Sequence, residues 1–290
     1  MEAAALQPTF VRLGPAALLH PVLLCVPHAG RDYPAAMLAN AAVPRDRLEA
    51  LEDRHVDALI AQAVAAGHGA FVAQRARCWL DLNRDEREID AGMLDPPPPS
   101  HRLIQSAKVR GGLGLIPRRA AGVGELWRAT LPAAEVEARI AGHHRPYHAA
   151  VAEMLETARA RFGAALLLDC HSMPPVPSEA FGPAPRIVLG DRFGRSAGGR
   201  LVDRIAALIE DAGLTVARNA PYAGGYTLDR HGRPARNVHA IQIEIDRSLY
   251  LDADRRGLGP GAAEVGRLLK AIATAMAEEL AVAPSAIAAE

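Results

Sequence analysis

The sequence predicts an α/β protein in which one mixed, mostly parallel sheet is sandwiched between helices, giving three layers. Short apolar runs without polar interruptions, which are typical of strands buried on both faces, alternate with segments whose apolar residues recur at helical spacing. Strands separated by helices favour parallel pairing, because a helix returns the chain to the starting edge of the sheet. Half of the 290 residues are hydrophobic. We expect a single domain over residues 1–290.

The expected strands are short apolar runs that end at a proline, a glycine or a polar group. The first such run covers residues 21–26 and stops at Pro27. The run at 238–245 differs from it because its apolar and polar residues alternate. The remaining expected strands are 70–73, 79–82, 164–169 and 186–189.

The expected helices show apolar residues three and four positions apart. Four successive prolines, Pro96 to Pro99, cannot continue a helix or a central strand, so residues 90–105 are predicted to form an excursion loop. Pro146 marks a break or a restart in the longest helical pattern. The expected helices are 46–66, 135–161, 196–212 and 261–280.

Composition limits the classes of partner. The 33 basic and 33 acidic residues balance, which argues against nucleic acid and against an anionic membrane surface. No apolar stretch reaches about 18 residues and the N-terminus lacks signal-peptide order, so we expect a cytoplasmic protein without a membrane span. Nearly all basic residues are arginines, and Lys108 and Lys270 are the only lysines. The sequence leaves the oligomeric state open.

Polar residues follow several of the apolar runs. His28 follows the first strand, Asn83-Arg84 the run at 79–82, and His171 the run at 164–169, while Glu244 lies near the end of the last strand. Because ligands bind beyond the carboxyl ends of strands in such sheets, we expect these side chains to converge on one edge.

Two imidazoles and one carboxylate form a common catalytic zinc site with an open position for water. We therefore expect one zinc ion on His28 and His171. The third ligand is less determined, with Asp53 as the first candidate and Asp32 or Glu52 as the alternatives.

Zinc lowers the pKa of its bound water and polarises a carbonyl, and a nearby carboxylate then moves the proton to the leaving nitrogen. Glu244 is the candidate for that base, the alternative being a salt bridge from Glu244 to Arg247. Asn83 and Arg84 could bind a substrate carboxylate, since arginine presents a bidentate fork, or they could cap a turn. Tyr147 and His148 could line the pocket or pack as helix residues.

With these residues in place, the sequence resembles the N-formylglutamate amidohydrolase family over about residues 22–252. No single motif decides the resemblance, but the joint order of the matching segments is specific. The segments are 26–30 (VPHAG), 52–57 (EDRHVD), 81–84 (DLNR), 114–118 (GLIPR), 146–148 (PYH), 169–174 (DCHSMP), 189–191 (LGD), 219–226 (NAPYAGGY) and 239–244 (HAIQIE).

The resemblance implies a zinc carboxypeptidase-like fold with zinc on His28 and His171 and with Glu244 as the base. Carboxypeptidases take the zinc carboxylate from a compact His-x-x-Glu, whereas here Arg31 stands three residues after His28, so the family-like position is Asp53.

The same resemblance suggests roles for substrate-binding residues. Asn83-Arg84 looks like the carboxypeptidases' carboxylate binder, and Arg118 is a candidate for binding substrate or the oxyanion. Tyr226 belongs to a matching segment and is a further candidate for the pocket. His231 stands where the family often has tyrosine, which bears on the choice of substrate.

The predicted activity is hydrolysis of N-formyl-L-glutamate, a small molecule, to formate and L-glutamate by a zinc-dependent amidohydrolase. One alternative is a zinc peptidase or deacylase acting on another N-acyl amino acid or a short peptide. A second alternative is a non-catalytic protein that binds a metal or an amino acid.

Overall fold

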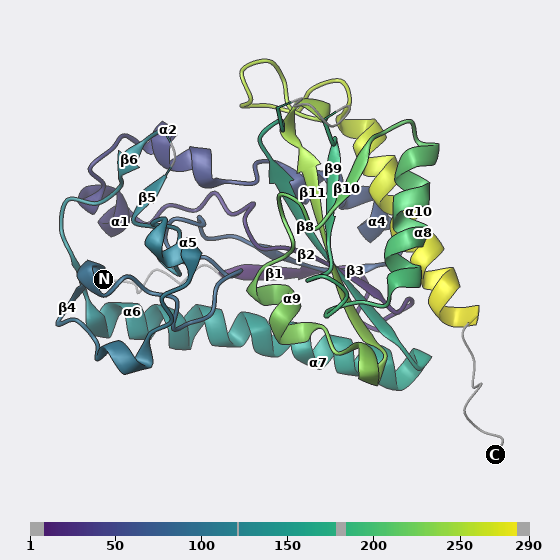
Figure 1. Ribbon diagram of the computed structural model, residues 1–290, viewed down its shortest axis with the longest axis horizontal. Helices are drawn as coiled ribbons and strands as arrows, with labels where there is room; N and C mark the ends of the chain where they lie inside the picture. The colour runs from purple at the N-terminus through teal and green to yellow at the C-terminus, as the bar shows by residue number, and fades with distance from the viewer. Residues whose placement is uncertain (1–8, 121, 178–183, 283–290) are drawn as a thin grey trace.

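The computed structural model describes residues 9–120, 122–177 and 184–282, and a seven-stranded sheet forms its centre (Figure 1). The strands of this sheet are β1 (Phe10–Leu13), β2 (Val22–Val26), β3 (Gly69–Ala73), β8 (Ala165–Met173), β9 (Ile187–Gly190), β10 (Val216–Arg218) and β11 (Val238–Asp246). Their order is β1-β3-β2-β8-β11-β9-β10. Four of the six pairings are parallel, and β1–β3 and β11–β9 are antiparallel. The predicted mixed, mostly parallel sheet is confirmed.

Helices cover both faces of the sheet, and shorter elements extend to one side of it (Figure 1). The α-helices are α1 (Ala35–Asn40), α2 (Arg45–Leu48), α3 (Val56–Leu59), α4 (Ala61–Ala65), α5 (Ala107–Arg110), α6 (Ala133–Arg139), α7 (Arg145–Phe162), α8 (Gly199–Asp211), α9 (Tyr226–His231) and α10 (Ala262–Val282). A π-helical turn covers Ile140–His144, and 3₁₀ turns cover Glu49–Leu51, Ala91–Met93, Ser100–Arg102, Pro234–Arg236 and Arg247–Leu249. Two small two-stranded sheets pair β4 (Leu94–Asp95) with β7 (Leu131–Pro132) and β5 (Arg119–Ala120) with β6 (Gly124–Glu125).

Strand β2 shows why the sheet has three layers. Its side chains alternate between two buried cores: Leu23 and Cys25 pack on the α7 side, whereas Val22, Leu24 and Val26 pack on the α8 and α10 side. All five residues are fully buried. Burial of a Val or Leu side chain stabilises the fold by about 1.5–3 kcal/mol, so both faces of this short strand contribute.

The single helix predicted over 46–66 was wrong, because the segment divides into α2, a 3₁₀ turn, α3 and α4. Glu52 is extended and His55 adopts a left-handed backbone with φ 64°, so the helical path stops between them. The apolar residues keep helical spacing on either side of this break, which is why the pattern alone concealed it. The interruption carries Asp53 toward the end of β2.

The strand predicted at 79–82 was also wrong, since this apolar run lies in a turn. The Asp81 N–H donates to the Leu115 carbonyl at 2.7 Å, and the Asp81 carboxylate accepts from the Asn83 N–H at 2.8 Å. A polar side chain that bonds backbone two residues ahead competes with strand pairing. The run therefore folds back on itself instead of joining the sheet.

The helical pattern over 135–161 becomes α6, the π-helical turn and α7, and Pro146 lies in the first turn of α7. The π-helical turn directly before it shifts the backbone hydrogen bonds, since the Arg145 N–H donates to the Ile140 carbonyl five residues back, and such a turn accommodates a proline within a continuous helix. The predicted excursion loop at 90–105 contains only short 3₁₀ turns and β4. In the described part of the chain, every helix is too short or too polar to cross a membrane.

Candidate active site

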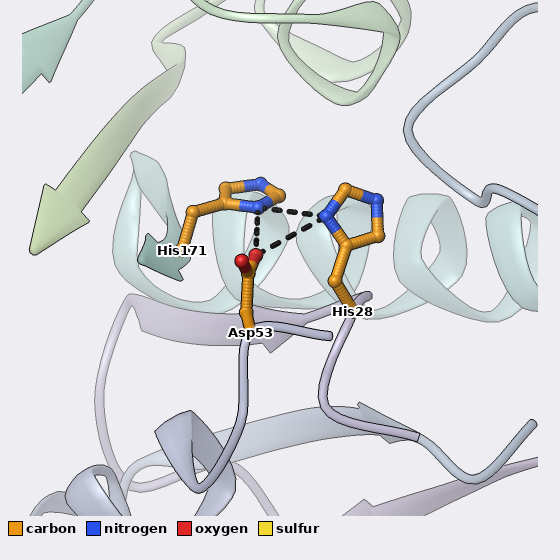
Figure 2. A group of neighbouring side chains, drawn as sticks. All are labelled: His28, Asp53 and His171. Atoms are coloured by element: carbon orange, nitrogen blue, oxygen red, sulfur yellow. Dashed lines mark hydrogen bonds and ion pairs between the residues drawn. The ribbon is translucent and has the colours of Figure 1, made fainter. Parts of the chain in front are cut away.

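Three side chains from three separate segments meet at the carboxyl edge of the sheet (Figure 2). His28 follows β2, His171 lies near the end of β8, and Asp53 stands at the break before α3. Asp53 Oδ2 lies 3.2 Å from His28 Nδ1 and 2.9 Å from His171 Nδ1, and the two Nδ1 atoms are 3.1 Å apart. All three side chains are buried.

This triangle of donor atoms fits a zinc ion. Zinc bonded to nitrogen and oxygen at about 2.0–2.2 Å in a tetrahedral arrangement separates its ligand atoms by roughly 3.3 Å. The three observed separations come within a few tenths of an ångström of that value. Two nitrogens and one carboxylate oxygen also match the donor set of catalytic zinc sites, which keep a fourth position open.

Asp53 is fixed in place through both its backbone and its second carboxylate oxygen. The Asp53 N–H donates to the His28 carbonyl at 2.9 Å, which ties the two segments together. Ser172 Oγ and Arg247 Nη2 lie 3.2 Å and 3.3 Å from Asp53 Oδ1. Oδ2 is therefore left to face the imidazoles.

Two further carboxylates lie beside the outer nitrogens of the histidines. His28 Nε2 lies 2.7 Å from Asp81 Oδ1, and His171 Nε2 lies 3.0 Å from Asp169 Oδ2. Such outer carboxylates fix the imidazole tautomer and ring orientation and raise the basicity of the ligating nitrogen. Both Nδ1 atoms consequently point toward Asp53.

The site is strongly polarised. Burial of the Asp53 carboxylate raises its pKa, but hydrogen bonds from His171 and His28 outweigh burial and hold this pKa well below its ordinary value. Burial likewise opposes a charge on His171, yet Asp169 and Asp53 hold its pKa well above the ordinary range. The triangle therefore favours an ionised carboxylate next to a positive charge, the arrangement that a bound cation would also satisfy.

A cavity of about 540 Å³ opens over this triangle. It is lined by His28, Ala50, Leu51, Asp53, Arg77, Asn83, Arg84, Lys108, Leu113, Ala120, His171, Ser172, Pro174, Arg192, Pro221, Tyr222, Ala223, Gly224, Gly225, Gln242, Glu244 and Arg247. The volume lies within the range of small-molecule sites. Five of these residues are Lys or Arg, so the cavity suits an anionic ligand.

Glu244 lies in the cavity wall on β11, in register with His171 on the neighbouring β8. Burial, together with the nearby Asp53 charge, raises the pKa of Glu244 to about 7 although His171 opposes the shift. Gln242 Nε2 donates to Glu244 Oε1 at 2.9 Å. Arg247 instead contacts Ser172, Asp53 and the Glu52 carbonyl, so the structure shows no salt bridge between Glu244 and Arg247.

Comparison with known proteins assigns the whole chain to a family. The sequence model of the family described as N-formylglutamate amidohydrolase matches residues 20–251. The chain belongs to the N-formylglutamate amidohydrolase family. The membership confirms the predicted resemblance and makes the chain a hydrolase of linear amide bonds.

Individual members of the family agree with this assignment. The N-formylglutamate deformylase of Pseudomonas aeruginosa is 31% identical over 236 residues, 80% of this chain and 82% of the relative. That of Pseudomonas putida is 29% identical over 237 residues, with the same coverage of both chains. The crystal structure of N-formylglutamate amidohydrolase from Ralstonia eutropha is 36% identical, covers 94% of this chain and 98% of its own, and superposes with a TM-score of 0.86.

The structure separates Asp53 from the other two candidate carboxylates. Asp32 forms an ion pair with Arg75 at 2.5 Å and does not line the cavity. Glu52 accepts from the Tyr33 hydroxyl at 2.5 Å and from Arg54 at 3.0 Å. Of these carboxylates only Asp53 is placed with the two histidines.

Asn83 and Arg84 both line the cavity and are fixed by the surrounding backbone. Asn83 Oδ1 accepts from the Thr227 N–H at 2.9 Å, and its Nδ2 lies 3.2 Å from His171 Nε2. Arg84 donates from Nε to the Leu113 carbonyl at 2.8 Å and from Nη1 to its neighbour's carbonyl at 2.7 Å. The remaining N–H groups of this guanidinium leave capacity for an anion.

Four other predicted site residues do not line the cavity. Arg118 pairs with Asp90 and Glu125 at 2.8 Å and 2.7 Å. The remaining three lie around α7 and α9: the buried Tyr147 ring packs edge-on to Phe10 and Phe71, His148 bonds the Leu82 carbonyl, and Tyr226 packs against His144 and His148. Their contacts support the segments that carry the site rather than the cavity surface.

Sequence reasoning missed several basic residues of the cavity wall, namely Arg77, Lys108, Arg192 and Arg247. Arg77 stands four residues before Asp81 and donates to it at 2.9 Å, a spacing that could have suggested the pair. Arg247 comes directly after β11, at the same kind of strand end that singled out His28, whereas Arg192 stands two residues after β9, which runs antiparallel to β11. No comparable signal marks Lys108.

Proposed function

We propose that this protein hydrolyses the amide bond of N-formyl-L-glutamate, releasing formate and L-glutamate, with zinc as its metal. One observation carries the proposal: a metal-type triangle, a buried carboxylate base and a wall of basic side chains share one cavity. The relatives named N-formylglutamate deformylase support the choice of substrate.

His28, Asp53 and His171 would hold the metal. When bound, it supplies a positive charge that lowers the pKa of water and polarises the formyl carbonyl. Asp81 and Asp169 orient the two imidazoles from outside, and Ser172 orients Asp53.

Glu244 would act as general base and then as general acid. In its ionised form it takes a proton from the attacking water, and it delivers that proton to the glutamate nitrogen as the C–N bond breaks. A carboxyl group with a pKa of about 7 is suited to both steps near neutral pH, because each protonation state is accessible. Glu244 lies in the cavity wall one strand away from His171, so it can reach a substrate held over the triangle.

Asn83 and Arg84 would bind one carboxylate of the substrate. Arg84 is buried and held by two carbonyl oxygens, so little side-chain entropy is lost when it binds an anion. A buried guanidinium paired with a carboxylate forms strong, directional hydrogen bonds. This contact would place the formyl group relative to Glu244.

Formate release from N-formyl-L-glutamate tests the proposal, with chelated, zinc-restored and untreated protein compared in parallel. We expect chelation to abolish release and zinc to restore it. E244A should lower the rate of formate release at least 100-fold while leaving the zinc content unchanged. A folded, zinc-loaded wild-type protein that releases no formate would refute the proposed substrate, and turnover of N-acetyl-L-glutamate instead would identify a different acyl group.

A further inference from the structure

The basic residues of the cavity wall differ in how far their charges are already neutralised. Arg77 pairs with Asp81 at 2.9 Å, Arg192 with Asp229 at 2.8 Å and Arg247 with Asp53 at 3.3 Å. Arg84 lies 3.9 Å from Asp81, which Arg77 already neutralises in part. Among the described residues, Lys108 alone in this wall has no acidic side chain within 4.0 Å.

Lys108 and Arg84 are held by the same short segment. Ser106 caps α5, its Oγ accepting from the Val109 N–H at 3.3 Å, and this places Lys108 in the first turn. The Lys108 carbonyl accepts from the Leu113 N–H at 2.8 Å, and the Leu113 carbonyl accepts from Arg84 Nε at 2.8 Å. The two cations therefore face one cavity from positions joined through Leu113.

The surroundings of Lys108 carry an excess of positive charge. Partial burial, together with the nearby charges of Arg84 and Arg77, lowers the pKa of its ammonium group. The carboxylates of Glu244 and Asp81 offset this charge only in part, and the like charges that remain cost free energy, which an anionic ligand would reduce. The Lys108 side chain stays partly accessible to solvent on a flexible four-carbon stem, so it can close onto a ligand that Arg84 has already bound.

We propose that Lys108 binds the second carboxylate of the substrate and thereby selects N-acyl amino acids with an acidic side chain over neutral ones. The inference rests on the proposed function, since it assumes that Arg84 takes the first carboxylate. It makes Lys108 a specificity-determining residue, and it assigns no role in bond cleavage to this side chain.

The chain offers a matched control, because Lys270 is the only other lysine and lies exposed on α10, away from the cavity. Formate release would be measured for wild type, K108M, K108R and K270M, with N-formyl-L-glutamate and with N-formyl-L-glutamine, which keeps the α-carboxylate but has a neutral side chain of the same shape. K108M should lower kcat/KM for the acidic substrate by roughly 10- to 100-fold, mainly through KM. For N-formyl-L-glutamine, K108M should change kcat/KM by less than about threefold. For N-formyl-L-glutamate, K108R should recover most of the lost kcat/KM, and K270M should match wild type.

Binding of the products separates this inference from the proposed reaction. Calorimetry should show that wild type prefers L-glutamate to L-glutamine and that K108M loses the preference. A wild-type protein with this preference but without formate release would support the Lys108 site and overturn the reaction. An active enzyme in which K108M leaves both substrates unchanged, or weakens both equally, would overturn the role of Lys108 and leave the reaction standing.

Discussion

His28 Nε2 lies 2.7 Å from Asp81 Oδ1, and this contact joins a candidate metal ligand to the segment that carries Asn83 and Arg84. Asp81 also accepts from the Asn83 N–H at 2.8 Å and from Arg77 at 2.9 Å. One buried carboxylate thus orients an imidazole and shapes the turn that would bind substrate. The candidate metal ligands and the turn that carries Asn83 and Arg84 are therefore joined through one residue.

D81N should weaken zinc binding by about 10- to 100-fold, because the amide no longer raises the basicity of His28 or fixes its ring. Competition with a chromophoric chelator measures the affinity. D32N is the matched control, since Asp32 is a partly exposed aspartate that pairs with Arg75 away from the cavity. Equal zinc affinities for D81N and wild type would show that Asp81 has no part in metal binding.

Zinc uptake should release protons. The pKa of His171 is held well above its ordinary value in the metal-free protein, so its imidazole carries a proton at neutral pH that the metal must displace. Apparent zinc affinity should therefore rise by about tenfold per pH unit between pH 6 and pH 8 for each proton released. Calorimetry in buffers of different ionisation enthalpy counts the protons. A pH-independent affinity with no released proton would contradict the charged state of His171.

Glu244 should destabilise the metal-free fold at high pH. Its pKa of about 7 exceeds the ordinary value of 4.5, so between these values the folded state binds more protons than the unfolded state and stability falls as pH rises. E244Q removes this loss and should be up to about 3 kcal/mol more stable than wild type at pH 8, with the difference fading below pH 4.5.

Urea unfolding of the metal-free proteins at pH 4.5 and pH 8 checks this expectation. The matched control is E264Q, an exposed glutamate on α10 that should leave stability unchanged at both values. A destabilised E244Q at pH 8 would mean that the carboxylate is well solvated or well paired in the fold. E244Q should also lose formate release. The carboxylate that lowers the stability of the fold at pH 8 would then be the one that the proposed reaction needs.

The sequence was sufficient to predict the buried inner strands of the sheet, because strands such as β2, β8 and β11 are uninterrupted or alternating apolar runs. The edge strands β1 and β10, which are only partly buried, were not predicted. The sequence also failed at 46–66 and at 79–82. There, polar backbone contacts made by Asp53 and Asp81 override an apolar pattern that reads as helix or strand. Both failures fall at the cavity: Asp53 lines it within the first segment, and Arg77 and Asn83 line it on either side of the second, where side chains serve the site rather than the regular element.

The candidate ligands could be predicted because His28 and His171 follow strands of one sheet, and parallel strands bring such residues to one edge. The pocket residues were harder. Nothing in the local pattern distinguishes Lys108, which reaches the cavity from a four-residue helix, from a surface lysine. Tyr147 and His148 follow each other in the chain, but their helix directs one ring into the core and the other toward the Leu82 carbonyl.

Arg118 is a residue whose suggested role in substrate binding can be tested directly. The resemblance suggested a role in substrate or oxyanion binding, whereas the structure pairs Arg118 with Asp90 and Glu125 outside the cavity wall. R118A should therefore keep kcat/KM for N-formyl-L-glutamate within about threefold of wild type. A loss of 100-fold or more with unchanged stability would mean that Arg118 leaves its ion pairs to reach the substrate.

His148 should act on the site through the turn that carries Asn83 and Arg84. His148 Nε2 lies 2.8 Å from the Leu82 carbonyl, and His144 Nε2 lies 2.8 Å from the Arg84 carbonyl, so two residues one helical turn apart hold both sides of Asn83. H148L leaves the buried Leu82 carbonyl without its donor and should cost about 1–3 kcal/mol of stability.

Loss of this anchor should also raise KM more than it lowers kcat, because Asn83 and Arg84 would no longer be held for the substrate carboxylate while Glu244 and the metal ligands remain in place. The glutamine variant H148Q, whose amide nitrogen stands near the position of the imidazole Nε2, can still donate to the Leu82 carbonyl and should bring KM part of the way back to the wild-type value. Steady-state kinetics together with urea unfolding separate the two effects. A loss of stability without any change in KM would show that His148 only packs in the fold and that α7 has no part in substrate binding.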